Sequence, residues 1–260
     1  LLTLGADTKL LSHGQAPTSS GSLFSPEILL AGLDLAGSFS VYDPTNGFVP
    51  FTGYTSRSGT FTPAAGGEIT EITGNATLAA NASVKALRIA AAQSLTMTSR
   101  TLTFTGADGK AGVILNNGKL NSGTIAFGTN KGYIYTSGQN AEITSAISGS
   151  GGVVLYGEPG TKVKCNSGTS SYSGRLTIAG TMAEVEDDDG LGASGTPITI
   201  DGGGSLGVKF NLSLGSLRPI RFGSGGARIH VNSGATFSSA GGLSGDGEFR
   251  KSGPGTVKWT

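Results

Sequence analysis

The chain has 260 residues, a formal net charge of +1 and only 13% charged residues. Hydrophobic residues make up 37%, enough for a folded core, which argues against a disordered chain. A charge this close to zero provides no basic surface for nucleic acid or an anionic membrane, so we expect neither as a partner. Glycine contributes 45 residues without a Gly-X-Y period, which excludes a collagen triple helix.

Residues 1–60 form the first region that the pattern distinguishes. Ser25-Pro26-Glu27 followed by apolar residues is a typical helix start, and Gly37 is a typical stop, so we predict a short helix between them. The apolar run 28–33 is too short to span a bilayer, and we expect no membrane insertion by this segment. We predict that this region is an irregular cap over the open end of a repetitive domain; the alternative is a junction that docks a neighbouring chain.

Residues 61–260 consist of short alternating segments separated by Gly, Asn and Ser. The segments Leu176–Ile178, Ile198–Ile200 and Ile229–Val231 each place apolar side chains on one face, and His230 falls on the opposite face. Alternation with a period of two is the pattern of β-strands. An antiparallel sandwich and a parallel β-helix with coils of roughly 20–25 residues both fit short strands of this kind.

A repeated Gly-rich phrase favours the β-helix. Residues 147–153 (Ile-Ser-Gly-Ser-Gly-Gly-Val) return as residues 243–249 (Leu-Ser-Gly-Asp-Gly-Glu-Phe), which is 96 positions later (243 − 147). Each copy is followed by a second Gly-rich turn, at 157–161 and at 253–256. Self-similarity at long range is typical of solenoids, in which similar units stack on one another. We therefore predict an all-β solenoid with stacked units.

The phrase and its continuation through Tyr172-Ser173-Gly174 and Gly180-Thr181 resemble the autotransporter-associated β-strand repeat. The resemblance covers about 143–206 and 229–260, the second repeat being truncated, and Met182-Ala183 departs from the family pattern. It implies a right-handed parallel β-helix in a bacterial cell-surface or extracellular protein, with a structural or adhesive role and no enzymatic activity. Unpaired strand edges at the ends of a β-helix predict self-association, end to end or lateral, and outward rows of Thr, Ser and Asn predict host or matrix glycans as the alternative partners. The matching positions are Gly149, Gly151, Gly160, Tyr172, Gly174, Gly180, Gly245, Gly247, Gly253 and Gly255.

The densest charge in the chain is an acidic segment. Its members are Glu184, Glu186, Asp187, Asp188 and Asp189. Mutual repulsion predicts a solvated loop without a cofactor. Two alternatives stay open: a Ca²⁺ site, because hard cations bind several carboxylate oxygens, and catalytic carboxylates working with Arg175 in a polysaccharide-degrading lyase or hydrolase.

Cysteine and histidine offer little further chemistry. Cys165 is the single cysteine, so no internal disulfide can form, and its place in the alternation predicts a buried strand residue. His13 and His230 are far apart, and no second cysteine joins them, which argues against a zinc site.

Overall fold

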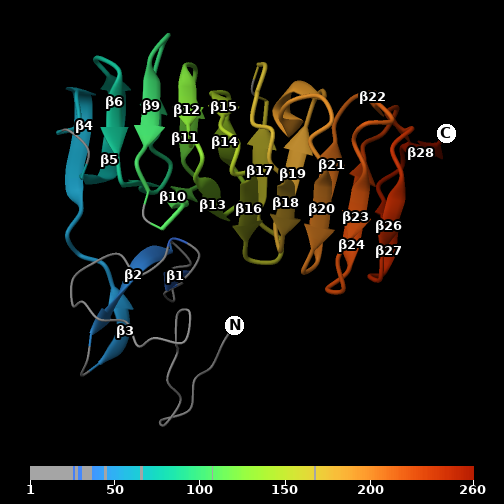
Figure 1. Ribbon diagram of the computed structural model, residues 1–260, viewed down its shortest axis with the longest axis horizontal. Coiled ribbons are helices and arrows are strands. Elements are labelled where there is room, and N and C mark those ends of the chain that lie inside the picture. Colours follow the sequence, from blue (N-terminus) through green and yellow to red (C-terminus); the bar gives the residue numbers. More distant parts are fainter. Residues whose placement is uncertain are drawn as a thin grey trace.

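The computed structural model describes Pro26 and residues 29–30, 37–43, 46–64, 67–106, 108–166 and 168–260. These residues form a parallel β-helix of about eight turns, seen as a rod with its coils running from left to right in Figure 1. The predicted all-β solenoid is confirmed. In the described part of the chain the one helical element is a short 3-10 turn, η1 (Asp189–Leu191).

Each coil turns through three faces, which we call A, B and C. Faces A and B together make one sheet of 18 strands. The strands of face A are β5 (Ile69–Leu78), β7 (Ala86–Ile89), β10 (Lys110–Asn116), β13 (Lys131–Ser137), β16 (Val153–Gly157), β18 (Leu176–Ala179), β20 (Ile198–Asp201), β23 (Ile220–Phe222) and β26 (Leu243–Gly245). Those of face B are β4 (Thr55–Phe61), β8 (Ser94–Thr96), β11 (Lys119–Asn121), β14 (Ala141–Ile143), β17 (Lys162–Cys165), β19 (Met182–Val185), β21 (Gly204–Val208), β24 (Ala227–Val231) and β27 (Phe249–Ser252). Because β4 and β5 are long, both bend around the corner between the two faces.

Face C is divided into two separate sheets. The first contains β6 (Ala82–Val84), β9 (Thr101–Phe104), β12 (Thr124–Ala126) and β15 (Ala146–Ser148), and the second contains β22 (Leu212–Leu214), β25 (Thr236–Ser239) and β28 (Thr256–Trp259). Between β15 and β22 two coils pass over this face without a strand, and one of them carries η1. The face C ladder is therefore interrupted in the middle of the rod.

The register sets the length of a coil. Val153 pairs with Leu176, Leu176 with Ile198, Ile198 with Ile220, and Ile220 with Leu243. The steps are 23, 22, 22 and 23 residues, so these four coils span 90 residues (243 − 153). The predicted coil length is confirmed.

A single apolar core runs along the inside of the rod. Alternate residues point inward on every face, and equivalent residues of successive coils stack, as in the row Leu155, Ile178 and Ile200. Among the inward residues named from the sequence, Ile178, Ile200 and Val231 are all 0% exposed. Full burial of such side chains stabilises the fold by roughly 1.5–3 kcal/mol each.

The N-terminal region packs against the side of the rod. β1 (Leu29–Leu30), β2 (Ser38–Asp43) and β3 (Gly47–Pro50) form a small antiparallel sheet beneath the first coils in Figure 1. Phe39 and Tyr135 belong to a second apolar cluster on the outer side of face A, and Tyr156 donates a hydrogen bond to the carbonyl oxygen of Pro26 at 2.8 Å. The described part of the predicted cap thus covers an apolar outer face of the coils, because that face exposes Ile and Tyr side chains.

The predicted helix is wrong where the structure describes it. Leu29–Leu30 pair with β2 as a strand, because a neighbouring strand satisfies their backbone groups and tertiary pairing overrides local helix signals. Pro26 is a turn residue, whereas Ser25, residues 27–28 and 31–36 of that predicted helix, and His13, lie outside the described residues. The first parallel pairing joins β4 to β5, so the solenoid begins a few residues before the predicted boundary at 61.

The repeated phrase occupies two different corners of the coil. Ile147 lies on β15 of face C, whereas Leu243 lies on β26 of face A. The offset of 96 residues exceeds the 90 residues of four coils by 6 (96 − 90), which advances the second copy by one face. The copies are therefore not equivalent units stacked in phase, although both lie in the same solenoid.

What the two copies share is a close approach between coils. A Cβ atom on Gly149 or Gly151 would overlap backbone atoms of Gly128 or Asn130 in the preceding coil. In the second copy Gly245 and Gly247 meet the backbone of Phe222 and Gly223 in the same way. The Gly-x-Gly phrase is a corner at which one coil lies directly on the backbone of the last, and only glycine leaves the necessary space.

Gly151→Ala tests this close approach. The added methyl group must displace the Asn130 backbone, and such overpacking costs about 1–3 kcal/mol, so we expect a clear fall in melting temperature. Gly215→Ala is the matched control, since nothing lies within 4 Å of its Cβ position. Differential scanning calorimetry compares the two, and equal melting temperatures would contradict the assignment.

Candidate functional site

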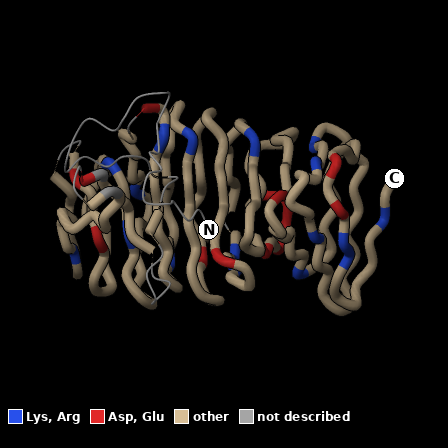
Figure 2. The backbone as a smooth tube through the Cα atoms, turned by 90° about the horizontal axis from the view of Figure 1, so that it is seen from below, with Lys and Arg blue, Asp and Glu red and all other residues tan. Residues whose placement is uncertain are grey.

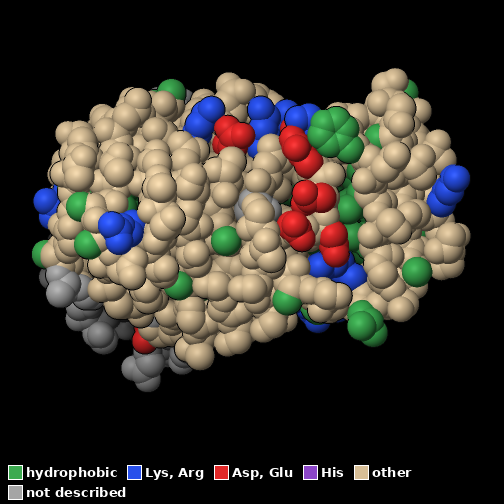
Figure 3. Space-filling view, turned by 90° about the horizontal axis from the view of Figure 1, so that it is seen from above, with side chains coloured by type: hydrophobic (Ala, Val, Ile, Leu, Met, Phe, Trp, Pro, Cys, Tyr) green, Lys and Arg blue, Asp and Glu red, His purple; other side chains and the backbone are tan. Residues whose placement is uncertain are grey.

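The acidic segment lies where face C is interrupted. Figure 3 shows a column of acidic side chains on this side of the rod, bordered by basic ones. The ion pairs are Glu184 with Lys162 at 3.3 Å, Glu186 with Lys209 at 2.6 Å and Asp188 with Arg218 at 3.0 Å, and each joins neighbouring coils. Asp187 accepts a hydrogen bond from the backbone N–H of Asp189 at 3.1 Å. Three of the five carboxylates therefore hold coils together.

These carboxylates do not converge on one point. In the part of the chain that the structure describes, no group of three or more His, Cys, Asp or Glu residues is arranged to hold a metal ion. Arg175 is exposed, and no ion pair joins it to the acidic segment within the described residues. Acidic and basic positions are also scattered over the rest of the rod, as Figure 2 shows. The Ca²⁺ site and the catalytic group remain predictions without a matching cluster.

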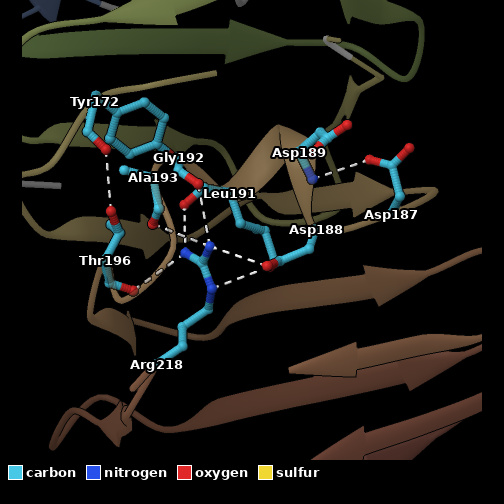
Figure 4. A network of polar contacts seen from close by, with 9 residues as sticks. All are labelled: Tyr172, Asp187, Asp188, Asp189, Leu191, Gly192, Ala193, Thr196 and Arg218. Atoms are coloured by element: carbon cyan, nitrogen blue, oxygen red, sulfur yellow. Dashed lines mark hydrogen bonds and ion pairs between the residues drawn. The ribbon is translucent and has the colours of Figure 1, made fainter. Parts of the chain in front are cut away.

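Arg218 is the centre of a buried polar network, drawn in Figure 4. Its side chain is 2% exposed, and its Nε lies 3.0 Å from Asp188 Oδ1. Nη1 donates to the carbonyl oxygens of Leu191 at 2.7 Å and Thr196 at 3.2 Å. Nη2 donates to Asp188 Oδ2 at 3.2 Å and to the carbonyl oxygens of Gly192 and Ala193, both at 3.1 Å. Both terminal nitrogens of the guanidinium thus donate to oxygen atoms of one loop, and Nε lies beside Asp188 Oδ1 as part of the ion pair.

This network replaces the missing strand pairing. The coil that carries η1 has no face C strand, so its carbonyl groups lack ladder partners, and buried carbonyls need a donor. Arg218 approaches from the following coil and supplies that donor to four of them. Thr196 Oγ1 adds a bond to the carbonyl oxygen of Tyr172 at 3.0 Å, and burial raises the pKa of the Tyr172 hydroxyl. The network therefore holds the coils together and leaves Arg218 no free donor for a ligand.

Arg218→Met tests this role. The variant keeps a long side chain but leaves Asp188 and the loop carbonyls without their donor. The Asp188 side chain is 41% exposed and can be hydrated, whereas each buried carbonyl left without a donor costs about 1–3 kcal/mol. We expect a large loss of stability in urea unfolding. Arg218→Lys should restore little of it, because an ammonium cannot reproduce the planar fork of donors. A Met variant as stable as the parent chain would show that the network is dispensable.

Chelation tests the calcium alternative. Because Glu184, Glu186 and Asp188 already have basic partners, we expect excess EDTA to leave the melting temperature unchanged. A fall that added Ca²⁺ reverses would contradict this expectation and restore the metal site, since a bound ion stabilises the folded state by mass action.

A second feature, absent from the sequence predictions, is a groove of about 300 Å³ on the outside of face B. Its floor is Ser205 on β21, with Gly203 just before that strand. Adjacent strands are about 4.8 Å apart, so the strands on either side of β21 stand roughly 10 Å from each other. The register places larger residues on both of them: Met182 and Glu184 on β19, and Arg228 and His230 on β24.

Glycine and methionine shape the groove. Met182 bends over Gly207, where a Cβ atom would lie 3.0 Å from its sulfur, and so leaves the space above Ser205 open. Thr161 and Lys162 line one end. A second hollow of about 240 Å³ shares Gly203 and Arg228 with the first and extends to Glu248 and Arg250. The two hollows adjoin at these shared residues, and we call them together the face B groove.

The remaining residues singled out from the sequence lie mostly at positions that are buried or that allow neighbouring coils to pack closely. Tyr172 is 2% exposed, and most of the glycines of the repeat pattern lie against backbone of the preceding coil; Gly160 has open space around it but a positive φ of 87°. Cys165 is 5% exposed, as predicted, and burial raises the pKa of its thiol to about 12. His230 faces outward, with Nδ1 3.1 Å from Ser252 Oγ.

No family model matches the chain, and neither the curated proteins nor the solved structures contain a significant match. The resemblance to the autotransporter-associated repeat therefore rests on the residues quoted from the sequence. Within the described residues no helix has the length and apolar character needed to cross a membrane.

Proposed function

We propose that this chain is a β-helical stalk segment of a bacterial cell-surface or extracellular protein, with a structural and adhesive role. The observation that supports it best is the use of charge: most of the ion pairs join one coil to the next. Arg88 with Glu71 and Lys119 with Glu142 repeat the arrangement found for the acidic segment. Charged groups placed in this way link each coil to the next, as a structural role requires.

The continuous core supports the same proposal. One apolar cluster extends from Ile72 in the early coils to Phe237 near the last one. In a solenoid each coil contacts its neighbours, so such a core resists bending over its whole length. The single free cysteine is buried, and packing with backbone ladders therefore supplies the stability without any disulfide.

Self-association belongs to the proposal as its partner hypothesis. In the described residues β26, β27 and β28 each pair with the preceding coil alone, and Leu243 and Trp259 are 41% and 40% exposed. Unpaired parallel edges of this kind accept a further strand. Either a following coil or another copy of the chain fits them.

The alternative function is a polysaccharide-degrading β-helix enzyme. One observation favours it: Glu184 and His230 both line the face B groove. Release of new reducing ends from a saccharide bound there would support this alternative over a purely adhesive role.

Surface labelling tests the proposed location. Ser233 is an exposed turn residue, so a Ser233→Cys variant carries an accessible, reactive thiol. This variant is expressed in cells of the source organism. We expect a membrane-impermeant maleimide to label this variant on intact cells or in the medium. The parent chain is the control, because buried Cys165 should react only after denaturation. Labelling of Ser233→Cys that requires cell lysis would refute the extracellular role.

A further inference from the structure

The face B groove contains a buried hydroxyl group that lacks a partner. Ser205 is 4% exposed, and its Oγ forms no hydrogen bond with the described residues. Buried polar side chains nearly always have a hydrogen-bond partner, and leaving one without a partner costs about 1–3 kcal/mol. Ser205 lines the groove, but its Oγ has less than 1 Å² of accessible surface, so the side chain must rotate about χ1 before a polar group in the groove can supply the missing bond.

The charges of the groove do not cancel. Lys162 is paired with Glu184 at 3.3 Å, and Arg250 with Glu248 at 2.9 Å. Arg228 lies between these pairs, is exposed, and has no ionic or hydrogen-bonding partner in the described part of the chain. The register also places Arg228 beside Arg250, so a second guanidinium adds to the positive potential at this point. The groove therefore favours an anionic group next to Arg228.

The lining also limits the class of ligand. Hydroxyl, amide, imidazole and guanidinium groups supply polar atoms, from Gln139, Thr181, His230 and Arg228 among others. The carboxylates in the lining, Glu184 and Glu248, are paired with Lys162 and Arg250. Phe, Tyr and Trp are absent from the lining of both hollows, which argues against single-stranded nucleic acid, whose successive bases need stacking partners. The lining residues of the groove come from several coils, which suits a linear oligomer, and its larger hollow is at the lower limit of common ligand sites, about 300–1,000 Å³.

The geometry points to binding of an acidic oligosaccharide in the face B groove. A carboxylate or sulfate of one sugar unit lies against Arg228, with the outer edge of His230 beside it. Sugar hydroxyls bond to Ser205 Oγ and to neighbouring polar side chains. This inference rests on the adhesive part of the proposed function and names the class of molecule to which the stalk adheres.

Binding to the purified chain tests the inference. The probes are a hexamer of uronic acid units, a sulfated hexasaccharide, a neutral hexasaccharide and an acidic peptide, each titrated by calorimetry at physiological salt. We expect one of the two charged saccharides to bind, which identifies carboxylate or sulfate as the anion, and the neutral sugar and the peptide to bind at least tenfold more weakly.

Substitutions locate the site. Arg228→Gln should raise the Kd of the charged saccharide about tenfold or more, because it removes a charged hydrogen-bond donor. Arg221→Gln is the matched control, an exposed arginine on β23 of the same coil that faces away from the groove, and should leave the Kd unchanged. Ser205→Ala should weaken binding about threefold or more while leaving the melting temperature unchanged or raised, because it deletes an unpartnered hydroxyl.

Three results would overturn the inference: no binding of either charged saccharide, equal binding of the acidic peptide, or an equal loss of affinity in Arg221→Gln. The last two would indicate diffuse electrostatic attraction. The surface-labelling experiment is independent of these results. Labelled intact cells together with no saccharide binding would reject the groove alone, whereas binding by a chain found only inside cells would reject the proposed location alone.

Discussion

The structure depends on one constraint: each coil must lie on the preceding one at the spacing of a β-sheet, about 4.8 Å. Parallel pairing in register fixes which side chain lies above which along the whole rod. Inward positions then form continuous apolar rows, and outward positions form rows whose composition changes from coil to coil. The close approach required at the corners explains why glycine is so abundant, because a Cβ atom at Gly151 or Gly247 would overlap backbone of the coil below.

The interruption of face C shows how the same constraint is met without a strand. Where the ladder stops, the carbonyl groups around η1 still need donors in a buried environment. Arg218 provides them from the next coil, and Asp188 neutralises its charge. Glu184, Glu186 and Asp188 of the acidic segment thus join neighbouring coils through ion pairs. The Arg218 side chain can donate to several carbonyl oxygens in place of backbone N–H groups because its donors lie in one rigid plane.

The face B groove follows from the outward rows. Where Ser205 replaces a larger side chain, the row of residues that stand out from the sheet is broken, and Met182 and Arg228 become the walls of a trough. The ion pairs at Lys162 and Arg250 leave Arg228 as the charge that is not compensated. The face B groove therefore combines space with a charge that has no ionic partner among the described residues.

The sequence by itself determined the class of fold, the length of a coil and the inward residues such as Ile178, Ile200 and Val231. It could do so because strand alternation and glycine turns are local properties of the chain. The tertiary structure alone decided the phase of the repeated phrase, the partners of the acidic segment, the side-on packing of β1–β3 and the groove at Ser205. Each of these depends on residues that lie a coil or more apart in sequence, and their alignment depends on the lengths of all the intervening turns. The alternation of residues along a strand does not reveal how residues of distant coils are aligned. The stacking of the coils fixes that alignment.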